Sequence, residues 1–244
     1  MATIIIGMKI CDNVKIGKNQ DKPAHIIGRK LFFDKIANEL KIPGLTFFRD
    51  YNFDDHLKMR SAGIRAEYSS LFANVPKLKE GIVLELGFDQ TVPNIDCKII
   101  SLAMEKAQSL NLPIIDNRVT ACCYVPEYTF VEKLQTISTK YRLQQENRIM
   151  PVIFLRHYYD IYKLLENERV LDFIGSNEYI AHKTKRFRAR DEKNLSKNLA
   201  FTIPDQTTRE LYAKEFRDKS AMYFGKQPEF NDILKRIFKY INQL

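Results

Sequence analysis

The feature that most constrains this chain is a change in composition near Pro126. Before it, short apolar and β-branched runs alternate with turns that contain Pro and Gly, and after it the sequence consists of long stretches of helix-forming residues. Short β-branched runs bounded by turn residues are typical of strands, and longer segments with apolar residues three and four apart are typical of helices. The 244 residues are therefore expected to form an α+β fold with two parts, residues 1–125 and residues 126–244.

The first part is predicted to be a small mixed sheet with helices. Strands are expected at residues 2–10, 45–51, 63–68, 81–88 and 121–125, and residues 95–110 are expected to begin as a strand and continue as a helix. An amphipathic helix is expected over residues 26–40, where Ile27, Leu31, Phe32, Ile36 and Leu40 recur near helical spacing. In the segment 81–88, Glu85 stands on the less apolar side of the strand.

The second part is predicted to be helical throughout. Helices are expected at residues 128–145, 152–166, 177–191, 205–224 and 229–242. Asp205 is expected to be an N-cap, because its side chain can accept a bond from an unpaired amide of the first turn.

Composition restricts the class of protein and its partners. Hydrophobic residues make up 45% of the chain and charged residues 28%, which is typical of a globular protein, and no apolar run approaches the ~20 residues of a membrane span. Four cysteines show neither zinc-site nor disulfide spacing, so reduced thiols and a cytoplasmic location are expected. The net charge of +9 favours an anionic partner such as a nucleotide or a nucleic acid.

Four charged residues in the first two predicted helices of the second part form a candidate site. Glu132 and Lys133 lie early in one helix, and Arg156 and Asp160 lie one turn apart on the next. Lys and Arg side chains hold phosphates, and a carboxylate can orient them, so the group is suited to a triphosphate. The alternative is a surface ion pair between Arg156 and Asp160, with Glu132 and Lys133 on a solvated face.

A basic stretch near residues 183–193 is a second candidate. Lys183, Lys185, Arg186 and Arg188 stand close to aromatic residues, which is a composition suited to RNA, including tRNA. The alternative is a solvated helix face whose cations are interspersed with acids.

Several segments, taken in order, resemble the AbiEii/AbiGii-type nucleotidyltransferase toxin family. They are KIGKNQDKPAHIIGRKLFFD, SAGIRAEY, GIVLELGFD, IIDNRV, EYTFVEKLQTISTKYR, RHYYDIYKLL and EYIAHKTKRFR. The resemblance implies a nucleotidyltransferase core like that of DNA polymerase β, followed by a helical domain. It also implies a toxin of a toxin–antitoxin or phage-defence system, with a cognate antitoxin, which transfers a nucleotide from an NTP to an RNA or protein hydroxyl.

The resemblance assigns roles to four residues. Glu85 matches a catalytic carboxylate that binds Mg²⁺, the expected cofactor, and Asp160 matches a catalytic residue of the helical motif. Lys133 and Arg156 match residues that bind the nucleotide.

The sequence departs from the family in one respect. A Gly-Gly or Gly-Ser turn followed by an Asp-x-Asp strand does not occur in these 244 residues. Glu85 alone is expected to hold Mg²⁺ weakly, because ligand charge and number set the affinity for hard cations. Impaired catalysis is therefore expected, as in a chain that lacks an N-terminal catalytic segment. The alternative is a non-catalytic nucleotide- or RNA-binding remnant or a regulatory paralogue.

Without the strand of the N-terminal catalytic segment, the sheet would have an open edge. An open sheet edge can pair with another chain, so a homo-oligomer is also expected.

Overall fold

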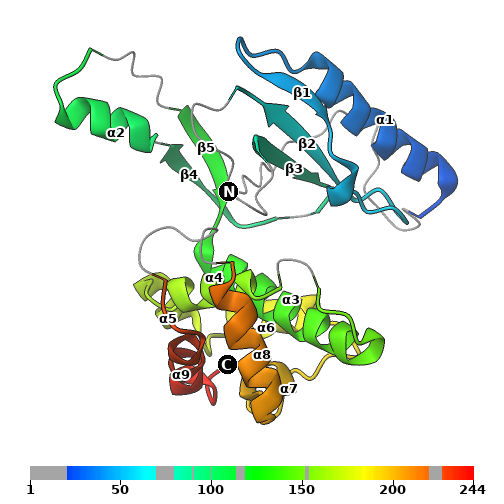
Figure 1. The fold of residues 1–244 in the computed structure, drawn as a ribbon. Coiled ribbons are helices and arrows are strands. Elements are labelled where there is room, and N and C mark those ends of the chain that lie inside the picture. Colours follow the sequence, from blue (N-terminus) through cyan, green and yellow to red (C-terminus); the bar gives the residue numbers. More distant parts are fainter. Residues whose placement is uncertain are drawn as a thin grey trace. The chain divides into compact units, whose positions relative to one another are not determined.

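The computed structural model describes residues 21–69, 80–89, 91–99, 101–113, 119–151, 154–219 and 227–244. The chain divides into two compact units, Met1–Tyr124 and Val125–Leu244. Strands in the first unit and helices in both confirm the α+β class (Figure 1). The strand expected at residues 2–10 lies outside the described residues.

The first unit contains two small antiparallel sheets. One has the strand order β1 (Thr46–Arg49), β2 (Ser61–Glu67) and β3 (Ile82–Gly87), and the other pairs β4 (Asn94–Ile99) with β5 (Val119–Tyr124). Helix α1 (Pro23–Glu39) precedes β1, the short 3₁₀ helix η1 (Tyr51–Phe53) follows it, and α2 (Leu102–Ser109) follows β4. Cys122 and Cys123 lie in β5, within the strand expected at residues 121–125, and Cys122 is exposed.

Helix α1 covers the three-stranded sheet, and the expected face is confirmed in part, since Phe32, Ile36 and Leu40 pack against the core of this unit. Its buried residues are Arg29, Phe33 and Ala37, whereas Ile27 and Leu31 are 57% and 61% exposed. Apolar residues lie on several sides of this helix, so their spacing alone does not select the face that packs. Arg29 can be buried because its guanidinium donates to the carbonyl of Lys58 at 2.6 and 3.0 Å.

The second unit consists of helices around one core. They are α3 (Pro126–Asn147), α4 (Arg156–Leu164), α5 (Glu168–Phe173), α6 (Asn177–Arg186), α7 (Leu199–Thr202), α8 (Gln206–Arg217) and α9 (Phe230–Tyr240). Phe130, Leu134 and Ile137 of α3 are fully buried in this core. Helix α3 packs against α4, α5, α6 and α7 and is therefore the central helix of the unit. No helix of the described residues is long and apolar enough to cross a bilayer.

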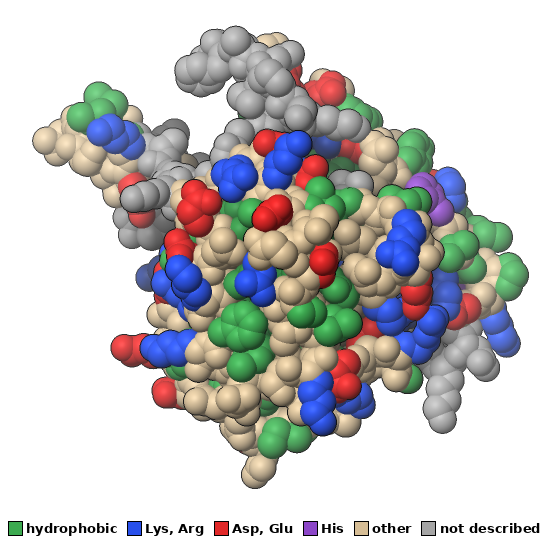
Figure 2. Space-filling model, turned by 60° about the horizontal axis from the view of Figure 1, so that its bottom comes forward, with side chains coloured by type: hydrophobic (Ala, Val, Ile, Leu, Met, Phe, Trp, Pro, Cys, Tyr) green, Lys and Arg blue, Asp and Glu red, His purple; other side chains and the backbone are tan. Residues whose placement is uncertain are grey.

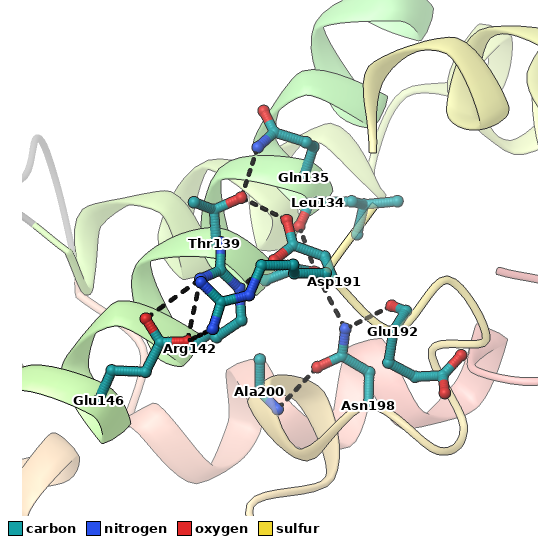
Figure 3. Close-up of polar contacts among 11 residues, drawn as sticks. Leu134, Gln135, Thr139, Arg142, Glu146, Asp191, Glu192, Asn198 and Ala200 are labelled. Carbon is teal, nitrogen blue, oxygen red and sulfur yellow. Dashed lines mark hydrogen bonds and ion pairs between the residues drawn. The ribbon is translucent and has the colours of Figure 1, made fainter. Parts of the chain in front are cut away.

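The helix expected over residues 177–191 ends at Arg186. Phe187 is buried and adopts an extended conformation, with φ −63° and ψ 134°. The chain then turns back to α3, where the buried Asp191 accepts hydrogen bonds from Thr139 and from Arg142, the latter at 2.8 Å (Figure 3). Asn198 extends this contact, since its amide donates to Ser138 at 3.0 Å and to the carbonyl of Glu192 at 2.7 Å. These tertiary bonds determine where the helix stops.

Candidate functional site

The candidate site of the second unit is built on α3 and α4. The ammonium of Lys133 on α3 lies 2.8 Å from Oδ2 of Asp160 on α4, and the two side chains are 26% and 21% exposed. The apolar residues that flank them, Leu134 on α3 and Ile161 on α4, are buried in the core and hold the two helices together. Asp160 therefore pairs across the helices with Lys133, and Arg156 lies one turn earlier on α4.

The surroundings of Asp160 stabilise its charged form. Burial by itself raises the pKa of this carboxyl, but the charges of Lys133 and Arg156 bring the pKa below its usual value. Asp160 is therefore an anion at neutral pH, in contact with a cation. A carboxylate in this position restricts the orientation of the Lys133 ammonium.

His157 lies beside this ion pair. Its side chain is 16% exposed, and Nδ1 is 3.8 Å from Oδ2 of Asp160, which is too far for a hydrogen bond. Within the described part of the chain, neither ring nitrogen has a hydrogen-bond partner. Burial lowers the pKa of His157, and Lys140 and Lys133 act in the same direction, whereas Asp160 opposes them. The ring is therefore neutral at pH 7.

Glu132 faces a different helix from its neighbour Lys133. Its two carboxylate oxygens contact Nε2 of His182 at 3.0 Å and Nε of Arg186 at 2.6 Å, both on α6. The reading of Glu132 and Lys133 as residues of a solvated face is therefore wrong. Both are largely buried, and each joins α3 to another helix.

The four basic residues near α6 differ in their surroundings. Lys183 donates to the main-chain oxygen of Leu244 and lies 5.6 and 5.7 Å from the rings of Tyr179 and Phe187. Burial lowers the pKa of Lys183 to about 8. Arg186 is bound to Glu132.

Lys185 and Arg188 are exposed. The four residues thus divide into two that make contacts within the unit and two that face solvent. On the face shown in Figure 2, cations and acids are interspersed.

Glu85 lies in the first unit, on β3 opposite Gly63 of β2. Its neighbours Leu84 and Leu86 pack into the core beneath α1, so Glu85 points to the other side of the sheet. On that side a Cβ on Gly63 would come within 2.7 Å of Cβ of Phe53 and 2.8 Å of the carbonyl oxygen of Asp50, so only glycine fits there. The strand pair therefore presents Glu85 beside a position that has no side chain.

The described residues do not by themselves form a magnesium site. Among them, no group of three or more His, Cys, Asp or Glu side chains could hold a metal ion. Glu85 supplies one carboxylate, so the remaining ligands of a Mg²⁺ ion would have to come from water, from the phosphates of a ligand or from other residues.

A cavity of about 360 Å³ lies elsewhere in the second unit, between α8 and α9. Its lining residues are Gln206, Arg209, Glu210, Ala213, Asn231, Leu234, Lys235 and Phe238. None of the residues expected to bind a nucleotide takes part in it.

Two histidines stand out in the structure but not in the sequence. His157 precedes Asp160 by three residues, and His182 precedes Arg186 by four, which are spacings of one helix face. The sequence gives no sign that Glu132 on α3 is the partner of His182, because that contact depends on how the helices pack. Spacing within a helix could have indicated only the proximity of His157 to Asp160.

A family model described as nucleotidyl transferase AbiEii toxin, type IV TA system, matches residues 14–236. Neither the curated proteins nor the solved structures contain a match to this chain.

Proposed function

This chain belongs to the AbiEii nucleotidyltransferase toxin family of type IV toxin–antitoxin systems, and on that premise we propose that it transfers a nucleotide from an NTP to an RNA or protein hydroxyl. The family implies a cognate antitoxin. The observation that carries the proposal is the contact of Lys133 with Asp160 across α3 and α4, close to Arg156.

In this proposal Lys133 and Arg156 bind the phosphates of the NTP. An ammonium and a guanidinium each donate several charge-assisted hydrogen bonds, and such bonds are stronger where water is partly excluded. Asp160 restrains Lys133 before the ligand arrives, which lowers the entropy lost on binding. The partial burial of all three groups supports a preorganised phosphate site over a solvated surface.

Mg²⁺ is proposed as the cofactor because of the family, with Glu85 as a ligand. Magnesium ions neutralise charge on a triphosphate and its leaving group. Since Glu85 is the only ligand assigned among the described residues, weak magnesium binding and low turnover are expected.

The test is transfer of label from each of the four NTPs to total RNA and to protein, with Mg²⁺ and with EDTA in its place. Lys133→Met is expected to raise the Kd of the NTP about tenfold or more, because a hydrogen bond to a charged group contributes ~1.5–3 kcal/mol. Lys163→Met is the matched control, since Lys163 is an exposed cation on α4 that pairs with Glu166. Glu85→Gln is expected to reduce transfer and to leave NTP affinity unchanged. If wild-type protein neither binds nor transfers any NTP, the proposal is wrong.

A second candidate function is nucleotide or RNA binding without turnover. The observation in its favour is that no cluster of metal ligands occurs among the described residues. NTP binding that requires Lys133, together with no transfer under any condition, would establish it.

The proposed RNA acceptor is tested separately with tRNA. Lys185 and Arg188 are exposed, so Lys185→Glu with Arg188→Glu should weaken tRNA binding in a gel-shift assay and leave the fold intact. Unchanged binding would remove these two residues from the proposal.

A further inference from the structure

His157 is an unsatisfied polar group beside the proposed phosphate site. Its side chain is 16% exposed, and neither ring nitrogen has a hydrogen-bond partner among the described residues. Buried polar atoms without a partner are rare in native proteins, and each one calls for an explanation. One explanation is a second state of the site in which the ring is bonded.

The geometry identifies Asp160 as the group that would bond to the His157 ring in that second state. Oδ2 of Asp160 lies 2.8 Å from the Lys133 ammonium and 3.8 Å from Nδ1 of His157. The same oxygen thus has one close cation and one ring nitrogen that is about 1 Å beyond the length of a charge-assisted bond. A small rotation of the two side chains on α4 would close this gap.

A triphosphate would compete with Asp160 for Lys133. Phosphate oxygens carry more charge than one carboxylate, and they would draw the ammonium toward the ligand. Arg156, the other cation near Asp160, is assigned to the phosphates as well, so Asp160 would remain 21% exposed without a cation of its own, which is costly for a carboxylate. The site therefore needs a replacement cation, and His157, whose Nδ1 lies 3.8 Å from Oδ2 of Asp160, can supply one.

We propose that NTP binding draws Lys133 away from Asp160, and that His157 then takes up one proton from solvent and becomes the partner of Asp160. This inference rests on the proposed NTP binding at Lys133. In it, His157 is a positioning residue that acts through Asp160.

The charges around the ring are consistent with this exchange. Lys133 and Lys140 on α3 disfavour protonation of His157 in the free protein, and Asp160 on its own helix favours it. On α9, Arg236 is bound to the carbonyl of Tyr162 near the end of α4 and to Glu166 just after α4. Bound phosphates would offset the positive charge of the two lysines, and the protonation equilibrium of His157 would shift toward the imidazolium.

The experiment is isothermal titration of the full chain with each of the four NTPs at pH 7, in HEPES and in imidazole buffer. These buffers differ in ionisation enthalpy, so the difference in heat gives the number of protons taken up. Wild-type protein is expected to take up as much as about one proton more than His157→Gln. Protons that the NTP itself gains or loses contribute equally to wild type and variant, so they cancel in the difference between the two. His182→Gln is the matched control, because His182 is bound to Glu132 on α3, and it should behave as wild type.

Three outcomes would overturn the inference. Equal proton uptake by wild type and His157→Gln would show that a group other than His157 titrates. The proposed function would still stand in that case if Lys133→Met weakens NTP binding. Absence of NTP binding by wild type would overturn both proposals. The third outcome is measured by NMR titration of the histidine rings of wild-type protein, so it does not depend on whether His157→Gln or His157→Asn folds. The pKa of His157 should rise when the protein is saturated with NTP. An unchanged pKa would contradict the proposal.

Discussion

Lys133 and Asp160 depend on each other because each is mostly removed from water. Their side chains are 26% and 21% exposed and their charged atoms lie 2.8 Å apart. Removal of one partner leaves a charge that has lost its counterion but has not regained its hydration. The ion pair between Lys163 and Glu166 provides a contrast, since those side chains are 50% and 42% exposed.

The first prediction is a coupling between Lys133 and Asp160 in the free energy of unfolding. Lys133→Met and Asp160→Asn should each destabilise the protein, and the double variant should be more stable than the sum of the two losses predicts by about 1–2 kcal/mol. Urea denaturation followed by circular dichroism measures the three values. The same cycle on Lys163 and Glu166 should give less than about 0.5 kcal/mol. Equal coupling in the two pairs would show that burial does not strengthen the α3–α4 contact.

The second prediction concerns the pH dependence of stability. Burial, with the two lysines, holds the pKa of His157 below its usual 6.5 in the folded protein. The unfolded chain then binds the proton more readily, so the contribution of the neutral ring is present above pH 6.5 and is lost as the pH falls through the lowered pKa. His157→Gln should therefore reduce the slope of unfolding free energy between pH 7 and pH 5. An unchanged slope in urea denaturation across this range would mean that His157 does not titrate as its surroundings indicate.

For single residues, the sequence predicted which charged side chains belong to the candidate site but not which side chains they contact. Spacing of four residues placed Arg156 and Asp160 on one helix face, because that relation is local. The contacts of Asp160 with Lys133 and of Glu132 with His182 join different helices. Such contacts depend on the rotation of each helix against the core, which the spacing of charged residues does not determine.

At the scale of elements, helix ends were harder to predict than helices. The segment after Arg186 is rich in charged residues, and neither Gly nor Pro marks a stop there. The helix ends because Phe187 is buried and Asp191 is bonded to α3. Helices α5 and α7, six and four residues long, were not predicted, because their length is too short for a periodic pattern.

The third prediction tests the contact that ends α6 (Figure 3). Asp191→Asn should destabilise the protein by about 2–4 kcal/mol, because a side chain with 0% exposure loses its charge opposite Arg142. Amide hydrogen exchange should accelerate in residues 187–198, which this carboxylate connects to α3. Glu192→Gln is the control, since that side chain is exposed, and it should change stability by less than about 0.5 kcal/mol. Comparable losses in the two variants would rule out a specific role for the buried carboxylate.

At the scale of the whole molecule, each unit has its own core. Phe33, Ile64 and Leu86 belong to one cluster of buried residues in the first unit. The cluster of the second unit is formed by residues between Phe130 and Leu244, all on one side of the division at Tyr124. The sequence indicated two parts through composition, since strand-forming and helix-forming residues are separated along the chain. Helical spacing indicated part of the packed face of α1, Phe32, Ile36 and Leu40, but it also included Ile27 and Leu31, which are exposed.

The last prediction is that residues 125–244 fold without the first unit. All the described residues of their core lie within the fragment, and a domain of roughly 100–150 residues is large enough to be stable alone. Because the chain has no Trp, unfolding in urea should be followed by far-ultraviolet circular dichroism and by tyrosine fluorescence. The two signals should give one coincident cooperative transition.

The fragment should also bind NTP with a Kd within about threefold of the full chain, since Lys133, Arg156 and Asp160 all lie in it. A folded fragment that does not bind NTP, although the full chain does, would show that phosphate binding requires residues of the first unit. A fragment without a cooperative transition would show that the helical core needs the rest of the chain.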